Sequence, residues 1–269
     1  MGTRKIKAAL SGILKMATLL LLLLNCSKVD AQVKISAKEK KADDKIIDRY
    51  IRQANREFVL DQIDTADRSN QELIDSLLKE RSITHFTEGH VTYSPDKKFK
   101  IFVFDGESCG GICTCFHDAF LYVAGSTIKQ KLSDETLPID TIFKLNDGKY
   151  LVLEKDQTCG GNVRYDYKKA VLLSFKNNRV IYHRFNYSDP RYGANNNNNA
   201  KELSLEQLVD DSDDMLLKFD PLTNSLSYKY SANLERCCNG TGAFSYIGYF
   251  KYEKGRFVHK KETKVKLKD

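Results

Sequence analysis

The sequence predicts an α+β protein in which N-terminal amphipathic helices precede a mostly antiparallel β-meander of about three hairpin-pair repeats, either propeller-like or closed as one sheet. Three observations carry this prediction. Apolar residues recur every three or four positions in residues 32–82, the period changes to two from about residue 83, and a unit of hairpin, Cys-Gly loop and hairpin then recurs. The chain therefore divides into residues 1–31, a helical segment 32–82 and a β-repeat domain 83–269.

Residues 1–31 have the features of an export signal peptide. Basic residues open the chain, and the apolar stretch 16–24 is shorter than the roughly 20 residues of a membrane-spanning helix. Two processing sites compete. Cleavage before Gln32 would release a soluble protein, whereas residues 23–26 resemble a lipobox in which Cys26 would carry a lipid. We expect a periplasmic, outer-membrane lipoprotein or secreted location, with membrane attachment only through Cys26.

The positive charge of the chain belongs largely to the signal. Removing residues 1–31 takes away five basic residues and one acidic residue, so the formal charge falls from +7 to +3. This balance does not indicate a nucleic-acid-binding surface. We expect the lysine-rich residues 259–268 to form a solvated end of the chain.

Residues 32–82 predict two helices. Ser69 and Glu72 have the spacing of a capping box that would begin the second helix. The apolar pattern of these helices is too short for the sustained heptads of a coiled coil, so we expect the helices to cover a β surface. The first helix would present its apolar side through Ile46, Ile47, Tyr50, Ile51, Ala54 and Phe58.

Turn residues separate the strands after residue 83. Proline, glycine, asparagine and aspartate occur between stretches of aromatic and β-branched residues, as expected for hairpins. The predicted turns are Pro95-Asp96-Lys97, Asn146-Asp147-Gly148, Lys176-Asn177-Asn178, Asp220-Pro221 and Glu253-Lys254-Gly255.

The strands repeat in three similar units. Each unit has a hairpin, a loop with cysteine and glycine, and a second hairpin; Cys109 and Cys159 are 50 residues apart, near the length of a four-stranded propeller blade. The third unit is longer because of residues 187–213, which we expect to be a loop insertion. Within it, Ser204 and Gln207 predict one short helix.

Six cysteines remain after either processing route, because Cys26 is removed or lipidated. An even number of cysteines in an oxidising compartment predicts up to three disulfides, although six cysteines allow 15 pairings. The disulfide candidates are Cys109, Cys113, Cys115, Cys159, Cys237 and Cys238.

Two chemical alternatives remain open around the first cysteine loop. Cys113, Cys115 and His117 would face one side of an extended chain, and zinc favours such nitrogen and sulfur ligands. Cys115, His117 and Asp118 also include residue types of nucleophilic catalysis, but adjacency in sequence does not bring them into hydrogen-bond reach.

Carboxylates near the cysteine loops offer a further alternative. Asp105, Glu107 and Glu154 have the chemistry for acid-base work, yet solvated loop carboxylates are the simpler interpretation. The sequence therefore predicts no catalytic residue.

Three stretches of the β region share one pattern: a turn, an aromatic strand and, in two of them, a Cys-Gly-Gly loop. They are SPDKKFKIFVFD with CGG, IFKLNDGKYLVLEKD with CGG, and LLKFDPLTNSLSY followed by YFKYEKGRF. In these motifs the chain from Ser94 onward resembles uncharacterised exported bacterial β-repeat, propeller-like envelope proteins. The resemblance implies an envelope location and a β fold, and it implies no catalytic residue.

Together these observations predict an exported, disulfide-stabilised binding or scaffold module without a cofactor. Its expected partner is an envelope protein or a glycan. The sequence favours a non-catalytic role but leaves two alternatives open: an exported hydrolase using loop carboxylates or His117, and a metal-binding or redox module using Cys113, Cys115 and His117.

Overall fold

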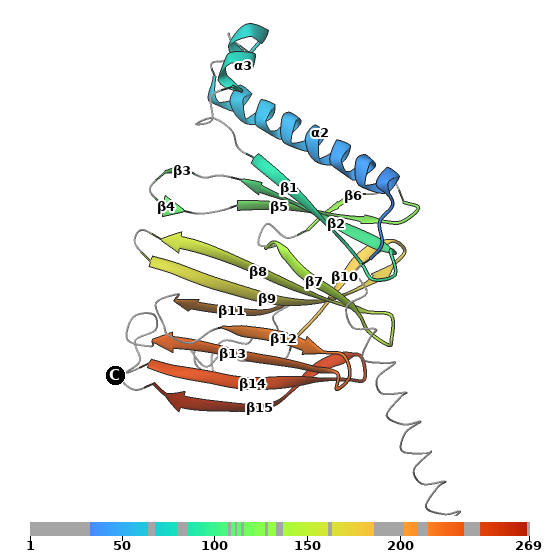
Figure 1. Cartoon of the computed structure of the whole chain (residues 1–269), viewed down its shortest axis with the longest axis vertical. Coiled ribbons are helices and arrows are strands. Elements are labelled where there is room, and N and C mark those ends of the chain that lie inside the picture. Colours follow the sequence, from blue (N-terminus) through green and yellow to red (C-terminus); the bar gives the residue numbers. More distant parts are fainter. Residues whose placement is uncertain are drawn as a thin grey trace, which may run out of the picture. The chain divides into compact units, whose positions relative to one another are not determined.

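Antiparallel strands account for most of the protein, and two helices precede them (Figure 1). The contacts of the chain separate Met1–Lys34 from the unit Ile35–Asp269, to which all elements described here belong. The computed structural model describes residues 33–63, 68–79, 86–106, 109–110, 112–113, 116–126, 129–132, 137–160, 163–185, 202–208, 215–233 and 243–267.

The two predicted helices are present. Helix α2 (Ala37–Gln62) begins at a capping box in which Ser36 Oγ accepts a hydrogen bond from the Glu39 amide at 3.2 Å. Helix α3 (Gln71–Leu77) begins at Asn70, whose Oδ1 accepts from the Leu73 amide at 3.1 Å. The predicted cap at Ser69 was wrong by one residue, because asparagine caps a helix as well as serine does. Among the described residues, no helix is long and apolar enough to cross a membrane.

Most of the strands form three antiparallel sheets. Sheet 1 contains β1 (Phe86–Tyr93), β2 (Phe99–Gly106), β5 (Phe116–Val123) and β6 (Lys129–Lys131). Sheet 2 contains β7 (Ile139–Lys144), β8 (Tyr150–Gly160), β9 (Val163–Lys176) and β10 (Arg179–His183), with β11 (Glu202–Leu208) also paired to β9. Sheet 3 contains β12 (Leu216–Asp220), β13 (Ser225–Asn233), β14 (Ala243–Glu253) and β15 (Arg256–Lys266). The short strands β3 (Cys109–Gly110) and β4 (Ile112–Cys113) pair with each other.

The five predicted turns all join neighbouring strands. Asn177 and Asn178 both have positive φ, 52° and 59°, as a two-residue turn of type I′ requires. Gly148 and Gly255 have φ values of 81° and 79°, which glycine adopts without the steric cost of a β-carbon. The local sequence therefore specifies where these five hairpins reverse.

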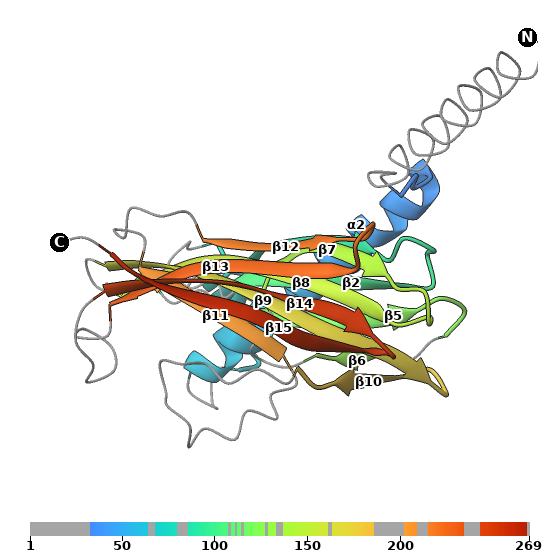
Figure 2. The same ribbon diagram turned by 90° about the horizontal axis from the view of Figure 1, so that it is seen from below.

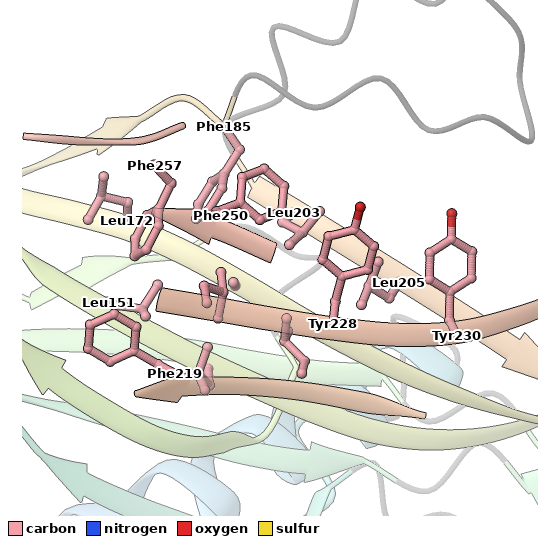
Figure 3. Packing of buried hydrophobic residues seen from close by; sticks show 14 of the residues in the cluster. Leu151, Leu172, Phe185, Leu203, Leu205, Phe219, Tyr228, Tyr230, Phe250 and Phe257 are labelled. Carbon is pink, nitrogen blue, oxygen red and sulfur yellow. The ribbon is translucent and has the colours of Figure 1, made fainter. Parts of the chain in front are cut away.

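Helix α2 and the three sheets pack in layers, in the order α2, sheet 1, sheet 2, sheet 3 (Figure 1). Alternate residues of β2 serve two cores: Phe102 and Phe104 face α2, whereas Ile101 and Val103 face sheet 2. Aromatic and aliphatic side chains fill the space between sheets 2 and 3 (Figure 3). Each interface between layers thus has its own apolar core.

One local prediction and the predicted closure of the sheet differ from the structure. Residues 202–208 form β11 on β9, where a short helix was predicted, because Leu203 and Leu205 alternate into the core between sheets 2 and 3. Residues 256–266 form the edge strand β15, and most side chains from residue 260 to residue 266 are exposed, as expected for a solvated end. The described strands form three sheets and the separate β3–β4 pair, and none of these sheets closes on itself.

Candidate functional site

Five charged or titratable side chains gather at one end of the interface between sheets 1 and 2. We call them the His–carboxylate cluster. Four come from sheet 1 and one from sheet 2, so the cluster depends on the packing of the two sheets. Its members are Glu88 and His90 on β1, Asp105 on β2, His117 on β5 and Asp156 on β8.

The alternation of the strands brings the cluster together. On β2, Asp105 lies on the same face as Ile101 and Val103, which pack against sheet 2. Asp105 is the register partner of His117 across β2 and β5, so the two side chains share this face. The strand faces that are apolar in the middle of the interface therefore carry charged residues at the strand ends.

His117 links the two sheets through both nitrogens of its ring. Its Nδ1 lies 2.8 Å from Asp105 Oδ1, and its Nε2 lies 3.0 Å from Asp156 Oδ2. The side chain is 7% exposed. Burial lowers the pKa of His117, but the hydrogen bonds with Asp105 and Asp156 outweigh it and raise the pKa to about 9. His117 is therefore an imidazolium at neutral pH, with both N–H groups donated to carboxylates.

This arrangement limits what His117 can do chemically. A general base needs a deprotonated ring nitrogen near the proton that it removes, and a metal ligand needs a free lone pair. Both nitrogens of His117 already face aspartates. The side chains of Cys113 and Cys115 lie outside the described ones, so a metal site of these three residues stays a prediction.

Glu88 and His90 form the solvent-facing side of the cluster. His90 Nε2 lies 3.1 Å from Asp105 Oδ2 and 3.9 Å from Glu88 Oε2. The side chains of His90 and Glu88 are 59% and 66% exposed, whereas that of Asp105 is 21% exposed. Asp105 thus connects an exposed group of side chains to the buried His117.

The described strands that carry cysteines end on one side of the sheets (Figure 1). Cys109 and Cys113 are backbone register partners in β3 and β4, and β4 contacts β8, which carries Cys159. The side chains of these three cysteines are not among those described. Cys26, Cys115, Cys237 and Cys238 lie outside the described residues. The disulfides therefore remain a prediction.

The other residues considered for catalysis are separated. Asp118 faces α2, where its carboxylate accepts from the Tyr50 hydroxyl and lies 3.0 Å from Lys131 Nζ, so it points away from His117. Glu154 is buried and accepts from the Leu137 amide at 2.9 Å. Glu107 lies outside the described residues.

Sequence reasoning identified Asp105 and His117 but missed Glu88, His90 and Asp156. The sequence did contain a signal for Asp156. Val152, Glu154 and Asp156 alternate on β8, so the face of this strand that packs on sheet 1 changes from apolar to acidic. No comparable signal marks Glu88 or His90, because their approach to Asp105 depends on the register of β1.

A cavity of about 350 Å³ lies between α2 and sheet 1. Its lining includes Tyr93, Tyr122, Lys97 and Lys100. The lysines are already paired with acidic residues of α2: Lys97 Nζ lies 3.5 Å from Glu39, and Lys100 forms an ion pair with the buried Asp43. The cavity therefore offers little unpaired charge for a ligand.

The outer face of sheet 3 has a different electrostatic character. Its strands alternate between the core shared with sheet 2 and this face, which no described helix or strand covers in Figure 2. Two neighbouring cross-strand rows of the face contain three lysines. We call these two rows the lysine face, and they comprise Lys218, Ser227, Tyr249 and Lys261 in one row, and Leu216, Lys229, Ile247 and Thr263 in the other.

No acidic residue lies in these two rows within the described part of sheet 3. Asp220 and Glu253 lie at the turn end of the sheet, and Glu262 accepts from the hydroxyl of the core residue Tyr228 at 2.6 Å. Lys218 and Lys261 are exposed and form no ion pair with a described residue. The lysine face is therefore a region of unbalanced positive charge.

Comparisons with known proteins identify no relative of this chain. No protein-family model, no curated protein and no solved structure matches it.

Proposed function

We propose that this protein is a non-catalytic binding module of the cell envelope, and that the lysine face binds an acidic glycan. The single observation that carries the proposal is the unbalanced charge of that face: Lys218 and Lys261 are exposed, and no described acidic residue shares their rows. The predicted export signal and the resemblance to exported β-repeat proteins support the envelope location.

The composition of the lysine face favours a glycan over two other partners. A second copy of the chain would bring lysines against lysines, which is unfavourable for a symmetric contact. Leu216 and Ile247 are exposed singly among polar residues, so the apolar area is small for insertion into a bilayer. Tyr249, in the same row as both lysines, adds an aromatic ring that can pack against a sugar.

The state of His117 argues against the hydrolase alternative. Its two ring nitrogens are 2.8 Å and 3.0 Å from carboxylate oxygens, and the side chain is buried between sheets. In this position the imidazole stabilises the packing of sheets 1 and 2 and has no ring nitrogen available to activate a water molecule.

We include in this proposal the interpretation of the three strand repeats as propeller-like. Each sheet contains a meander of four antiparallel strands, with the β3–β4 pair inserted between β2 and β5 of sheet 1 and β11 added to sheet 2. Four strands are the composition of a propeller blade, and this supports three related repeats. We propose an open stack of three such repeats in which α2 covers sheet 1 and sheet 3 leaves its outer face for the partner.

Glycan binding is tested with a charge-reversal pair. Lys218→Glu together with Lys261→Glu should abolish binding of the protein to polygalacturonate, measured by isothermal titration calorimetry. The matched control is Lys41→Glu with Lys45→Glu, which makes the same change of net charge on the exposed side of α2 and should leave binding intact. Binding should also weaken as salt is added.

Three outcomes would reject this proposal. They are equal loss of binding in both double variants, equal binding of neutral dextran, and binding only to phosphatidylglycerol vesicles. The first would indicate a general charge effect, the second a neutral sugar site, and the third a membrane surface.

A further inference from the structure

We infer that Glu88, His90 and Asp105 form a binding site for a divalent transition-metal ion of the zinc type. The site lies on the solvent-facing side of the His–carboxylate cluster. It uses different residues from the lysine face and from the cysteine-containing site considered in the sequence, so it is independent of the proposed glycan binding.

The spacing of the three ligand groups suits one metal ion. His90 Nε2 is 3.1 Å from Asp105 Oδ2 and 3.9 Å from Glu88 Oε2, and one ligand atom from each residue lies within 4.8 Å of the others. Ligand atoms at about 2.0–2.2 Å from a zinc ion are separated by roughly 3–4 Å. The side chains therefore need only small rotations to bind an ion.

A β-bulge places Glu88 and His90 on the same face as Asp105. Phe86 faces α2, and so does Gly89, where a β-carbon would lie 2.9 Å from the ring of Phe104. The register of β1 against β2 shifts between Phe86 and Glu88, so Thr87 is the extra residue. Without this bulge, Glu88 would follow Phe86 toward α2; bulges commonly re-aim side chains at functional sites.

The charge of the site also favours a cation. Several other described carboxylates are paired with lysine, as in Asp43 with Lys100 and Asp118 with Lys131. The described ion pairs of Glu88 and Asp105 involve only histidines. Asp105 is already paired with the His117 imidazolium, but Glu88 has no lysine or arginine partner among the described residues, so the site keeps a negative charge that attracts a cation.

His117 provides support behind the ligands. It holds Asp105 Oδ1 at 2.8 Å, which leaves Oδ2 directed at His90, and Asp156 holds the other side of the His117 ring. Metal-binding carboxylates are commonly oriented by such hydrogen bonds from a second layer of residues. Asp105 is therefore fixed before an ion arrives.

The ligand set selects the class of metal. One imidazole and two carboxylates favour zinc and neighbouring transition metals, whereas calcium prefers six to eight oxygen ligands. The exposure of His90 and Glu88 leaves open coordination positions for water.

Metal titration of the full-length protein tests the site. Zinc is titrated by calorimetry, and cobalt(II) is used as a spectroscopic probe of the ligand atoms. The wild-type protein should bind one ion per chain. His90→Ala and Glu88→Gln should each weaken binding by at least about tenfold. Both residues are exposed, and circular dichroism should confirm that the variants are folded.

The control is His183→Ala, because His183 contacts the Ser174 hydroxyl at 2.8 Å and forms no described ion pair with a carboxylate. This variant should bind metal like the wild type. The proposal is wrong if His90→Ala binds zinc as tightly as the wild type, or if bound cobalt shows the intense near-ultraviolet charge-transfer band of thiolate ligands, which would assign the ion to cysteines. Polygalacturonate binding should be unchanged by His90→Ala, so the two proposals can fail separately.

Discussion

His117 shows how one residue can join two sheets. A buried charge is costly unless opposite charges and hydrogen bonds surround it. His117 meets this condition with one aspartate from its own sheet and one from sheet 2.

Asp96 makes a second link between these sheets, because its carboxylate accepts from the Tyr150 hydroxyl and from Lys144 Nζ, both at 2.9 Å. Burial opposes the charge on Asp96, but these hydrogen bonds lower its pKa to about 2.

The raised pKa of His117 predicts a loss of stability at high pH. The imidazole has a pKa of 6.5 in its ordinary state and about 9 in the folded protein, so folding favours its protonated form. Its contribution is complete below pH 6.5 and is lost as the pH rises through 9. The free energy of unfolding, measured by urea denaturation with a chelator present, should therefore differ most between wild type and His117→Gln at pH 6.

At pH 10 the same difference should be much smaller. Comparing wild type with His117→Gln at each pH cancels the titration of lysines and tyrosines, which both proteins share. A difference that stays constant from pH 6 to pH 10 would show that His117 does not carry a proton in the folded protein, and would contradict the arrangement of two donated N–H groups.

At the scale of elements, α2 is attached to sheet 1 by an apolar stripe and by polar contacts, which include an anchor at the start of β1. The predicted stripe of Ile46, Ile47, Tyr50, Ile51 and Ala54 packs against the phenylalanines of sheet 1. The anchor is Asn55, a buried side chain that satisfies the backbone at the start of β1. Its Nδ2 donates to Phe86 O at 2.8 Å, and its Oδ1 accepts from Phe86 N at 2.7 Å.

Replacing this anchor should destabilise the docking of α2. Asn55→Ala removes the two hydrogen bonds to the backbone of Phe86 and leaves the Phe86 N–H and C=O groups buried without these partners. We expect the free energy of unfolding to fall by about 2 kcal/mol or more. The measurement is the free energy of unfolding, together with the hydrogen exchange of β1. Gln53→Ala is the control on the exposed side of the same helix, where Gln53 bonds only Glu57 at 2.9 Å in its described contacts. Equal effects of the two substitutions would contradict the role given to Asn55.

The elements themselves were largely predictable from the sequence because their signals are local. Turn chemistry placed five of the reversals, as at Asn177 and Asn178, and the three- to four-residue period located α2. The strand β11 was missed because Ser204 and Gln207 also match a helix cap, and only pairing with β9 decides between the two structures. Where the local pattern fits a helix and a strand equally well, the tertiary contacts determine which of the two forms.

The candidate site was only partly predictable because it is assembled at the scale of the whole molecule. Asp105 and His117 were noted from the sequence for their residue types and their proximity to the cysteine loops. Their partner Asp156 comes from another sheet, and no pattern in the chain states which sheet packs on which. The bulge that turns Glu88 toward Asp105 likewise has no glycine or proline at its extra residue, Thr87, to mark it.

Sheet 2 is the centre of the layered structure because both of its faces are buried. Residues 150–154 of β8 and residues 169–173 of β9 are each at most 6% exposed, although successive side chains point to opposite sheets. Leu151 and Leu172 pack toward sheet 3, whereas Val152 and Val171 pack toward sheet 1. The strands β8 and β9 are therefore shared by two apolar cores.

This position predicts that β8 and β9 are the last strands to open. In native-state hydrogen exchange, amides of residues 150–154 and 169–173 should exchange most slowly, because their exposure requires both cores to separate. Leu172→Ala should lower the free energy of unfolding by about 2–5 kcal/mol and should accelerate exchange in sheets 2 and 3 together. Leu216→Ala makes the same chemical change at a side chain that is 42% exposed on the lysine face, so we expect its cost to be below about 1 kcal/mol. Slower exchange in sheet 1 or sheet 3 than in β8 and β9 would show that an outer layer, and not the shared sheet, holds the molecule together.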